Sequence, residues 1–228
     1  MVGFMVSGRT EWHLNTAIKG VKPAFQGRSR QRRNELIDAG IQLLCDKGIA
    51  DISIEELCTE CGYSVGTFYS RFDDKISFFK AVQEAAVTEM LRLIDEGIGG
   101  EKWKSAPAEE IFARVVNHTI DILTSDIRGV VIESLIISRT SKTTWEPIRL
   151  CGRRMAEILI ETLKDKFLEE DPETSRESIL FGMQMFFGTL IQAILNDPGP
   201  VKLKDPLLRE NLTRMLCLYA RLKPENTP

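Results

Sequence analysis

The sequence predicts an all-α fold, and three observations support this prediction. Apolar residues recur at helical spacing along most of the 228 residues, whereas short alternating runs typical of strands are not clustered. A complete helix start signal is present at Ser53 and Glu56. Glycine and proline separate the helical stretches from one another, as they do at helix ends.

The composition is that of an ordinary globular protein, with 43% hydrophobic and 28% charged residues. No run approaches the roughly 20 apolar residues that a membrane-spanning helix needs. The first residues lack the basic region that begins a secretory signal. We therefore expect a cytoplasmic protein with no membrane partner, and we expect no cofactor and no metal site.

The first part of the chain reads as three helices. An apolar stripe predicts a helix over 31–48. Ser53 and Glu56 form a capping box that starts the second helix, which Gly62 ends. Ser64 is placed to cap a third, short helix.

Further helices follow to the end of the chain. Thr174 with Glu177 predicts the start of one of them, after the helix breaker Asp171–Pro172. The expected helices after the third cover residues 75–97, 106–124, 127–140, 142–169, 175–196 and 206–222.

The stretch GYSVG, at residues 62–66, matches the Gly-x-Ser-x-Gly pattern of a nucleophile elbow. That motif needs a strand before the serine, and an acid and then a histidine further along the chain. Helical periodicity precedes Ser64, and the only histidines are His13 and His118. We therefore interpret the match as accidental and expect no enzyme activity.

A helix, a glycine turn and a short helix, preceded by another helix, form a helix-turn-helix arrangement. In the short helix the i, i+4 pair Phe68 and Phe72 is expected to face the core. Recognition helices present their N-terminal residues to base edges. The residues expected on the outer side are Val65, Gly66, Thr67, Tyr69 and Arg71.

The segment ISIEELCTECGYSVGTFYSRFDDKISFF resembles the DNA-binding segment of TetR-type transcriptional regulators. Cysteines at 58 and 61 stand where that family usually has alanine, and Val65 stands where it often has a basic or small polar residue. The resemblance covers about one quarter of the chain. The residues that match in register are Gly62, Ser64, Gly66, Thr67, Tyr69, Phe72 and Lys75.

Positive charge is concentrated at the start of the chain. Residues 1–33 contain seven basic residues and one acidic residue, while residues 34–80 contain four basic and nine acidic residues. Such an arm can follow phosphates or enter the minor groove, although a solvated charge run is an equal alternative. Ser64 could equally be a plain helix cap, and Arg71 and Lys75 could be solvated. The candidate DNA-binding residues are Arg28, Arg30, Arg32, Arg33, Ser64, Val65, Gly66, Thr67, Tyr69, Arg71 and Lys75.

The resemblance implies a ligand pocket among the central helices. Simple core packing is the alternative for each candidate, and His118 is the most informative because it is polar on an apolar stripe. The candidate ligand-binding residues are Met90, Phe112, Val116, His118, Trp145, Ile148, Cys151, Met155 and Phe186.

The resemblance also implies a homodimer built by the last two helices, as a two-fold symmetric operator would require. The candidate interface residues, which could instead fill the core, are Met183, Phe187, Leu190, Ile194, Leu208, Leu212, Met215 and Tyr219.

Together these readings divide the chain into three parts. They are a flexible N-terminal extension over 1–27, a helix-turn-helix DNA-binding domain over 28–80, and a helical ligand-binding and dimerisation domain over 81–228. The expected function is a DNA-binding transcriptional regulator, a repressor released from double-stranded operator DNA by a small hydrophobic or aromatic effector. The alternative is a dimeric small-molecule-binding protein of the same fold with a degenerate DNA-binding head.

Overall fold

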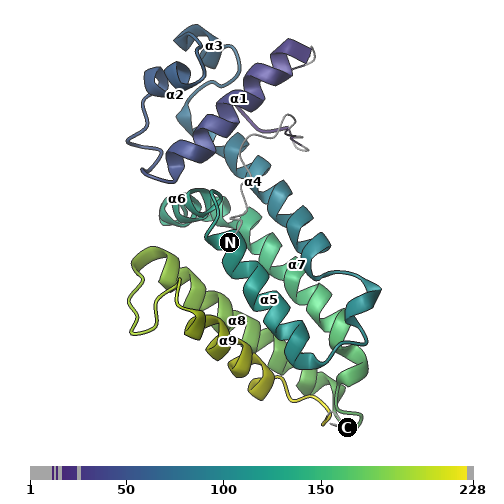
Figure 1. Cartoon of the computed structure of the whole chain (residues 1–228). Helices are drawn as coiled ribbons and strands as arrows, with labels where there is room; N and C mark the ends of the chain where they lie inside the picture. Colours follow the sequence, from purple (N-terminus) through teal and green to yellow (C-terminus); the bar gives the residue numbers. More distant parts are fainter. Residues whose placement is uncertain (1–11, 13, 15–16, 25–26, 225–228) are drawn as a thin grey trace. The chain divides into compact units, whose positions relative to one another are not determined.

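The computed structural model describes residues 12, 14, 17–24 and 27–224. In this part of the chain every regular element is a helix, and extended pairing is limited to two isolated bridges. Figure 1 follows the helices from purple α1 to yellow α9. The predicted all-α fold is confirmed.

The chain forms two compact units, and each consists of two segments. Of the described residues, the N-terminal unit contains those up to residue 90 and 122–148, and the C-terminal unit contains 91–121 and those from residue 149 on. The long helix α4, Lys75–Ile98, contributes to both. This division is made by packing, so the functional boundary expected after residue 80 stays a prediction.

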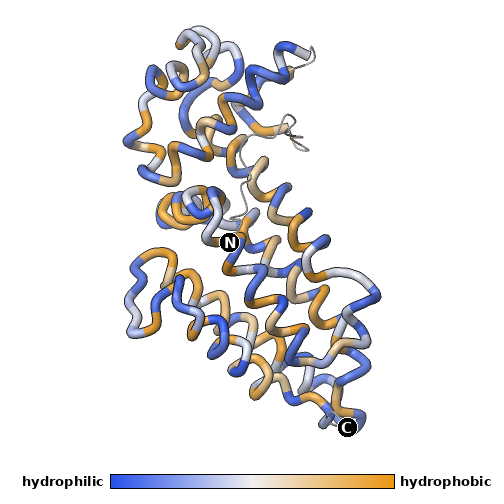
Figure 2. The backbone as a smooth tube through the Cα atoms, viewed as in Figure 1, coloured by the Kyte–Doolittle hydropathy of each residue, from blue (hydrophilic) through white to orange (hydrophobic). Residues whose placement is uncertain are grey.

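Most helices of the N-terminal unit begin and end close to the predicted positions, but α1 is shifted by four residues and ends at Leu44 rather than at residue 48. α1 starts at Gly27 rather than at residue 31, which places the basic cluster inside the helix. Figure 2 shows hydrophilic and hydrophobic residues alternating along these helices, as amphipathic helices require. The unit contains α1 (Gly27–Leu44), α2 (Ile54–Glu60), α3 (Val65–Tyr69), the first part of α4, α6 (Arg128–Ser138) and the 3-10 helix η2 (Lys142–Trp145).

An aromatic cluster forms the centre of the helix-turn-helix. The ring centroids of Phe68 and Phe72 are 5.3 Å apart, and Phe78 of α4 lies 5.5 and 5.0 Å from these two rings. All three side chains are essentially buried. Since α3 has only five residues and is too short to be stable alone, this packing fixes its inner side.

Side-chain caps define two helix starts in this unit. Ser53 Oγ accepts a hydrogen bond of 3.0 Å from the Glu56 amide, as the capping box predicts. At the start of α4, Asp74 Oδ1 accepts a 2.7 Å bond from the Ser77 amide, while Ser77 Oγ accepts a 3.1 Å bond from the Asp74 amide. The bond from the Ser77 amide is the largest of the effects that hold the pKa of the Asp74 carboxyl below its ordinary value.

The C-terminal unit is a bundle of long helices in which α8 and α9 pack side by side (Figure 1). The predicted cap of α8 is wrong: Asp171, not Thr174, is the N-cap, and Pro172 is the first helical residue. Proline suits that position because its missing N–H would have no partner there anyway. The helices are the end of α4, η1 (Glu101–Trp103), α5 (Ala108–Leu123), α7 (Glu146–Leu163), η3 (Lys164–Lys166), α8 (Pro172–Asn196) and α9 (Pro206–Tyr219).

Within the described residues, α8 is the one helix that is long and apolar enough to cross a membrane by length and composition. Core helices of soluble proteins pass the same test, so this is weak support for a membrane span. Eight of its residues, Phe186 and Leu190 among them, are buried in the chain.

Candidate nucleic-acid interface

The GYSVG stretch links two helices. α2 precedes it, Gly62 adopts a left-handed φ of 68°, and α3 follows Ser64. A nucleophile elbow requires a strand on the side that α2 occupies. Ser64 instead stands at the N-cap position of α3, and its Oγ lies 3.2 Å from Thr67 Oγ1. The arrangement is a helix-turn-helix.

The short helix α3 turns one face inward and one outward, as the sequence predicts for Phe68 and Phe72. Tyr69 is 47% exposed, and Gly66 is also exposed. Val65 and Thr67 are half-buried. Small side chains at the start of this helix allow the backbone to come close to a groove. Contact of these residues with DNA stays a prediction.

The arginines of α1 lie on the first two turns of that helix, whereas the predicted start at residue 31 left Arg28 and Arg30 outside it. Arg28, Arg30 and Arg32 are exposed. The half-buried Arg33 donates bonds of 3.1 Å to the Trp12 carbonyl and 3.3 Å to Asn34 Oδ1.

The pKa of Arg33 is affected by other basic groups of the same unit. Burial lowers the pKa of Arg33, and the positive charges of Arg30 and Arg71 lower it further. Arg71 Nε is buried and has no hydrogen-bond partner among the described residues. A cluster of like charges favours an anion such as a phosphate nearby.

Lys75 has a structural role that the sequence did not indicate. Its Nζ donates to the carbonyls of Ile49, Ala50 and Ile52, over 3.1, 2.8 and 3.0 Å. An ammonium group has three donors, so these bonds use all of them. The side chain ties the loop before α2 to the start of α4, and a phosphate contact would have to share its donors. Every residue has a backbone carbonyl, so no pattern in the sequence identifies these three as the partners of Lys75.

Residues 17–24, which the sequence assigned to a flexible extension, include a stretch that contacts the helix-turn-helix. Val21 forms an isolated antiparallel bridge with Phe72, just after α3. The remainder of the predicted extension, apart from Trp12, Leu14 and Gly27, lies outside the described residues. The part of the chain around Val21 therefore packs against the helix-turn-helix.

Helix α6 packs in the same unit as the helix-turn-helix, which was also not predicted. Its buried Glu133 accepts a hydrogen bond from the Ile49 amide. Lys75 binds the carbonyl of this same residue, so the loop before α2 is held from both α4 and α6.

The candidate ligand-binding residues are divided between the units: Met90, Trp145 and Ile148 belong to the N-terminal unit. In the C-terminal unit, His118 is buried, and its Nε2 lies 2.7 Å from the Leu93 carbonyl. Burial lowers its pKa, which favours the neutral imidazole. The other candidates of this unit are buried too: Phe112, Val116, Cys151, Met155 and Phe186.

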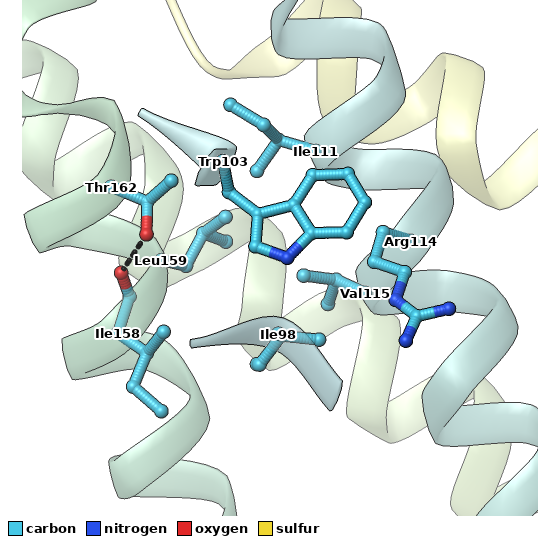
Figure 3. A pocket seen from close by; sticks show the side chains of 8 residues that line it. All are labelled: Ile98, Trp103, Ile111, Arg114, Val115, Ile158, Leu159 and Thr162. Carbon is cyan, nitrogen blue, oxygen red and sulfur yellow. Dashed lines mark hydrogen bonds between the residues drawn. The ribbon is translucent and has the colours of Figure 1, made fainter. Parts of the chain in front are cut away.

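The C-terminal unit contains a cavity of about 10 Å³, which is room for about one water. None of the nine candidates lines it. Figure 3 shows the Trp103 indole in the middle of the group, with Thr162 and Arg114 on opposite sides. The Arg114 guanidinium lies 5.6 Å from the ring centroid, and Trp103 Nε1 is buried without a partner among the described residues. The lining residues are Ile98, Trp103, Ile111, Arg114, Val115, Ile158, Leu159 and Thr162.

Most residues of the predicted dimer face lie inside their own chain, as the alternative of core packing expects, and the dimer stays a prediction. Met183, Leu190, Ile194, Leu208 and Leu212 are buried inside their own chain, and only Tyr219 of the set is exposed. Phe187 and Met215 are half-buried. Because α8 and α9 are apolar on more than one side, their pattern could not show which side faces outward. The large apolar residues of α8 and α9 that are exposed are Leu180, Phe181, Met185, Leu195, Leu207, Leu218 and Tyr219.

An open groove of about 780 Å³ lies along the C-terminal end of α8. Met185 lines it, so the groove continues the exposed apolar face of that helix. The other lining residues are Gln184, Gly188, Thr189, Gln192, Ala193, Pro198, Gly199, Pro200, Val201 and Leu208.

Known proteins resemble this chain most clearly in the helix-turn-helix. Residues 36–82 match the model of the family described as bacterial regulatory proteins, tetR family. An uncharacterized HTH-type transcriptional regulator, YerO of Bacillus subtilis (strain 168), is 28% identical over 87 residues, which are 37% of this chain. The match covers 30% of the length of that relative.

Solved structures share the fold over most of the chain. A tetR-family transcriptional regulator from Streptomyces coelicolor has a TM-score of 0.61 at 17% identity, over 82% of this chain and 80% of its own. A structure from Mesorhizobium loti MAFF303099 assigned to the same family has a TM-score of 0.66 at 18% identity, over 84% and 96%. The multidrug binding protein EbrR, complexed with imidazole, has a TM-score of 0.52 at 19% identity, over 86% and 92%. These identities support a common fold.

Proposed function

Since residues 36–82 match the tetR family of bacterial regulatory proteins, we propose that this chain is a sequence-specific, DNA-binding transcriptional regulator. The finer proposal is a cytoplasmic repressor that a small hydrophobic or aromatic molecule releases from its operator. The observation that carries the proposal is the geometry of α3, which rests on buried Phe68 and turns Tyr69 outward within the matched segment.

Charge supports DNA as the partner. The chain has a net charge of −3, so a general attraction to nucleic acid is not expected. Positive charge is instead concentrated around α1 and the end of α3, where the charges of Arg30 and Arg71 lower the pKa of Arg33. Phosphates of an operator would compensate this local charge.

A second copy of the chain would supply the second reading head for a two-fold operator. The exposed apolar side of α8, with Phe181 and Met185, is the surface that supports this proposal. Exposed aromatic and methionine side chains are enriched at such interfaces.

Support for a small-molecule effector is of two kinds. One structural relative is described as a multidrug binding protein in complex with imidazole. The cavity at Trp103 has an unused indole donor beside a cation, which suits a molecule with an acceptor group. Its volume of about 10 Å³ means that such a molecule would have to enlarge it. A titration of intrinsic fluorescence with imidazole, with Trp103→Phe as control, tests this part separately.

Selection of bound duplexes from a randomised DNA pool, at two salt concentrations, tests the main proposal. The intact protein is expected to enrich a two-fold symmetric site, and Tyr69→Ala is expected to lose this enrichment. Leu150→Ala is the matched control, because Leu150 has a similar exposure of 45% and lies on α7.

Two other outcomes would contradict the proposal. Salt-sensitive binding without an enriched sequence would mean that the arginines only hold phosphates. Failure to bind any duplex would favour the alternative, a small-molecule-binding protein with a degenerate head, for which Val65 on α3 is the motivating residue.

A further inference from the structure

Residues 20–22 pair with the chain that leaves α3. The Lys22 amide donates a 2.7 Å hydrogen bond to the Arg71 carbonyl, and the Asp73 amide donates a 2.9 Å bond to the Gly20 carbonyl. These bonds enclose the Val21–Phe72 bridge. A segment far from α3 in sequence thus fixes the backbone of the turn between α3 and α4.

The Lys22 side chain binds the end of the recognition helix itself. Its Nζ donates a 2.7 Å bond to the carbonyl of Tyr69, the last residue of α3, and lies 3.3 Å from Asp73 Oδ1. Carbonyls in the last turn of a helix have no partner within the helix, and a cation there is favourable. Lys22 therefore supplies a C-terminal cap to α3 from outside the helix-turn-helix sequence.

Gly20 is required for this docking. Its φ of 85° is left-handed, and a Cβ added there would lie 2.7 Å from Ser77 Cβ. Other residues reach this conformation only at a cost in free energy, and this contact leaves no room for a side chain. The glycine allows the segment to turn closely against the start of α4.

A second attachment lies at Trp12, which is 4% exposed. Its Nε1 donates a 2.7 Å hydrogen bond to Asp38 Oδ1 on α1, and its carbonyl accepts the bond from Arg33. The segment is thus held both at α1 and at the end of α3. A segment that only offered charge to DNA would not need two buried or glycine-dependent attachments.

We propose that the N-terminal segment is a working part of the DNA-reading unit, which holds α3 in its reading position, and that Lys22 is its positioning residue. The inference rests on the proposed function. It differs from a role for the segment as a phosphate-binding arm, because it acts through the Tyr69 and Arg71 carbonyls.

The test compares Gly20→Ala, Lys22→Met and Lys22→Arg with the wild type, using the selected operator and a scrambled duplex over a salt series. Gly20→Ala changes no charge, so it separates positioning from phosphate binding. We expect it to lower operator affinity about tenfold, with the salt slope and the affinity for scrambled DNA unchanged. Lys22→Met is expected to act in the same direction, and Lys22→Arg is expected to restore most of the affinity.

Lys19→Met is the matched control, since exposed Lys19 lies in the same segment and its loss removes the same charge. Operator affinity equal to that of the wild type in both Gly20→Ala and Lys22→Met would overturn the proposal. So would a parallel loss on both duplexes in Lys22→Met with the salt slope reduced by about 0.9, the value for one lost phosphate contact.

Hydrogen exchange of the Lys22 and Asp73 amides separates failure of this inference from failure of the proposed function. If the wild type selects no operator, the proposed function fails, and exchange still reports whether Gly20→Ala releases the segment. Unchanged protection of both amides in that variant would contradict the docking. Faster exchange confined to these amides and to α3 would support it.

Discussion

Gln83 Nε2 on α4 lies 2.7 Å from Ser134 Oγ on α6, and both side chains are buried. The same nitrogen donates a 2.8 Å bond to the Thr144 carbonyl in η2. One amide group therefore joins three elements of the N-terminal unit. Buried polar groups that lose such partners carry the full cost of desolvation.

Replacing Gln83 by leucine is expected to lower the free energy of unfolding by about 1–3 kcal/mol, because the Thr144 carbonyl loses its buried partner. Urea denaturation measures this change. Gln42→Leu is the control, since exposed Gln42 makes only a long bond of 3.4 Å to Asp126. If both replacements lower the free energy of unfolding equally, the buried bonds of Gln83 stabilise the fold no more than the exposed bond of Gln42.

Glu133 predicts a pH dependence of stability. Burial raises the pKa of its carboxyl above the ordinary value of 4.5, and the nearby Asp51 charge acts in the same direction. The folded state then binds the proton more tightly than the unfolded state, so this contribution is present below pH 4.5 and is lost as pH rises through the folded pKa.

The Glu133→Gln variant has no carboxyl to titrate at this position, so this loss of stability with rising pH should be absent from it. Its stability relative to the wild type is expected to increase as pH rises from about 4 to about 7. Chemical denaturation across that range measures the difference, and exposed Glu60→Gln controls for the removal of a carboxyl charge. A difference that stays constant with pH would contradict the raised pKa.

Lys75→Met is expected to destabilise the protein even without DNA, by roughly 1–3 kcal/mol, because the Ile49, Ala50 and Ile52 carbonyls lose a cationic donor. Thermal or urea unfolding of the unbound protein measures this. Exposed Lys80→Met on the same helix serves as the control. A variant of normal stability that binds DNA weakly would assign Lys75 to phosphate contact instead.

Exposed and buried residues of α8 are expected to affect the proposed dimer differently, which sedimentation velocity can measure. Met185→Glu places a charge on a side chain that is 51% exposed, so we expect a folded protein with a weakened dimer. Leu190→Ala empties space in the chain's own core, and we expect it to lower stability by about 2–5 kcal/mol while the exposed face of α8 stays intact. A dimer that tolerates Met185→Glu would exclude this face.

Gly97 allows α4 to lie close to His118. A Cβ at Gly97 would lie 2.2 Å from His118 Nε2, so alanine must displace the imidazole from the Leu93 carbonyl. We expect Gly97→Ala to cost about 1–3 kcal/mol of stability, as overpacking does. At Gly152 in α7 the added Cβ would make an ordinary 3.5 Å contact with Phe187, and alanine there should be neutral or stabilising. Calorimetry of both variants measures these stabilities, and an equal effect of the two replacements would contradict the close contact at Gly97.

Local patterns in the sequence determined the helices and the reading unit. The capping box at Ser53 and the inward pair Phe68 and Phe72 are both present as predicted, because they depend on residues within one or two turns of each other. The helix-turn-helix and its resemblance to the tetR family also depend on residues that are close together in the sequence. The all-α fold required nothing beyond this periodicity.

Contacts between distant segments were decided only by the tertiary structure. Lys22 and Lys75 bind backbone carbonyls, which every residue has, so no side-chain pattern could reveal their partners. The outward side of α8 was equally hidden, since an apolar helix offers several faces and its neighbours determine which one is covered. Periodicity specifies that a helix forms, whereas packing against the remainder of the chain selects what each face and each loop will touch.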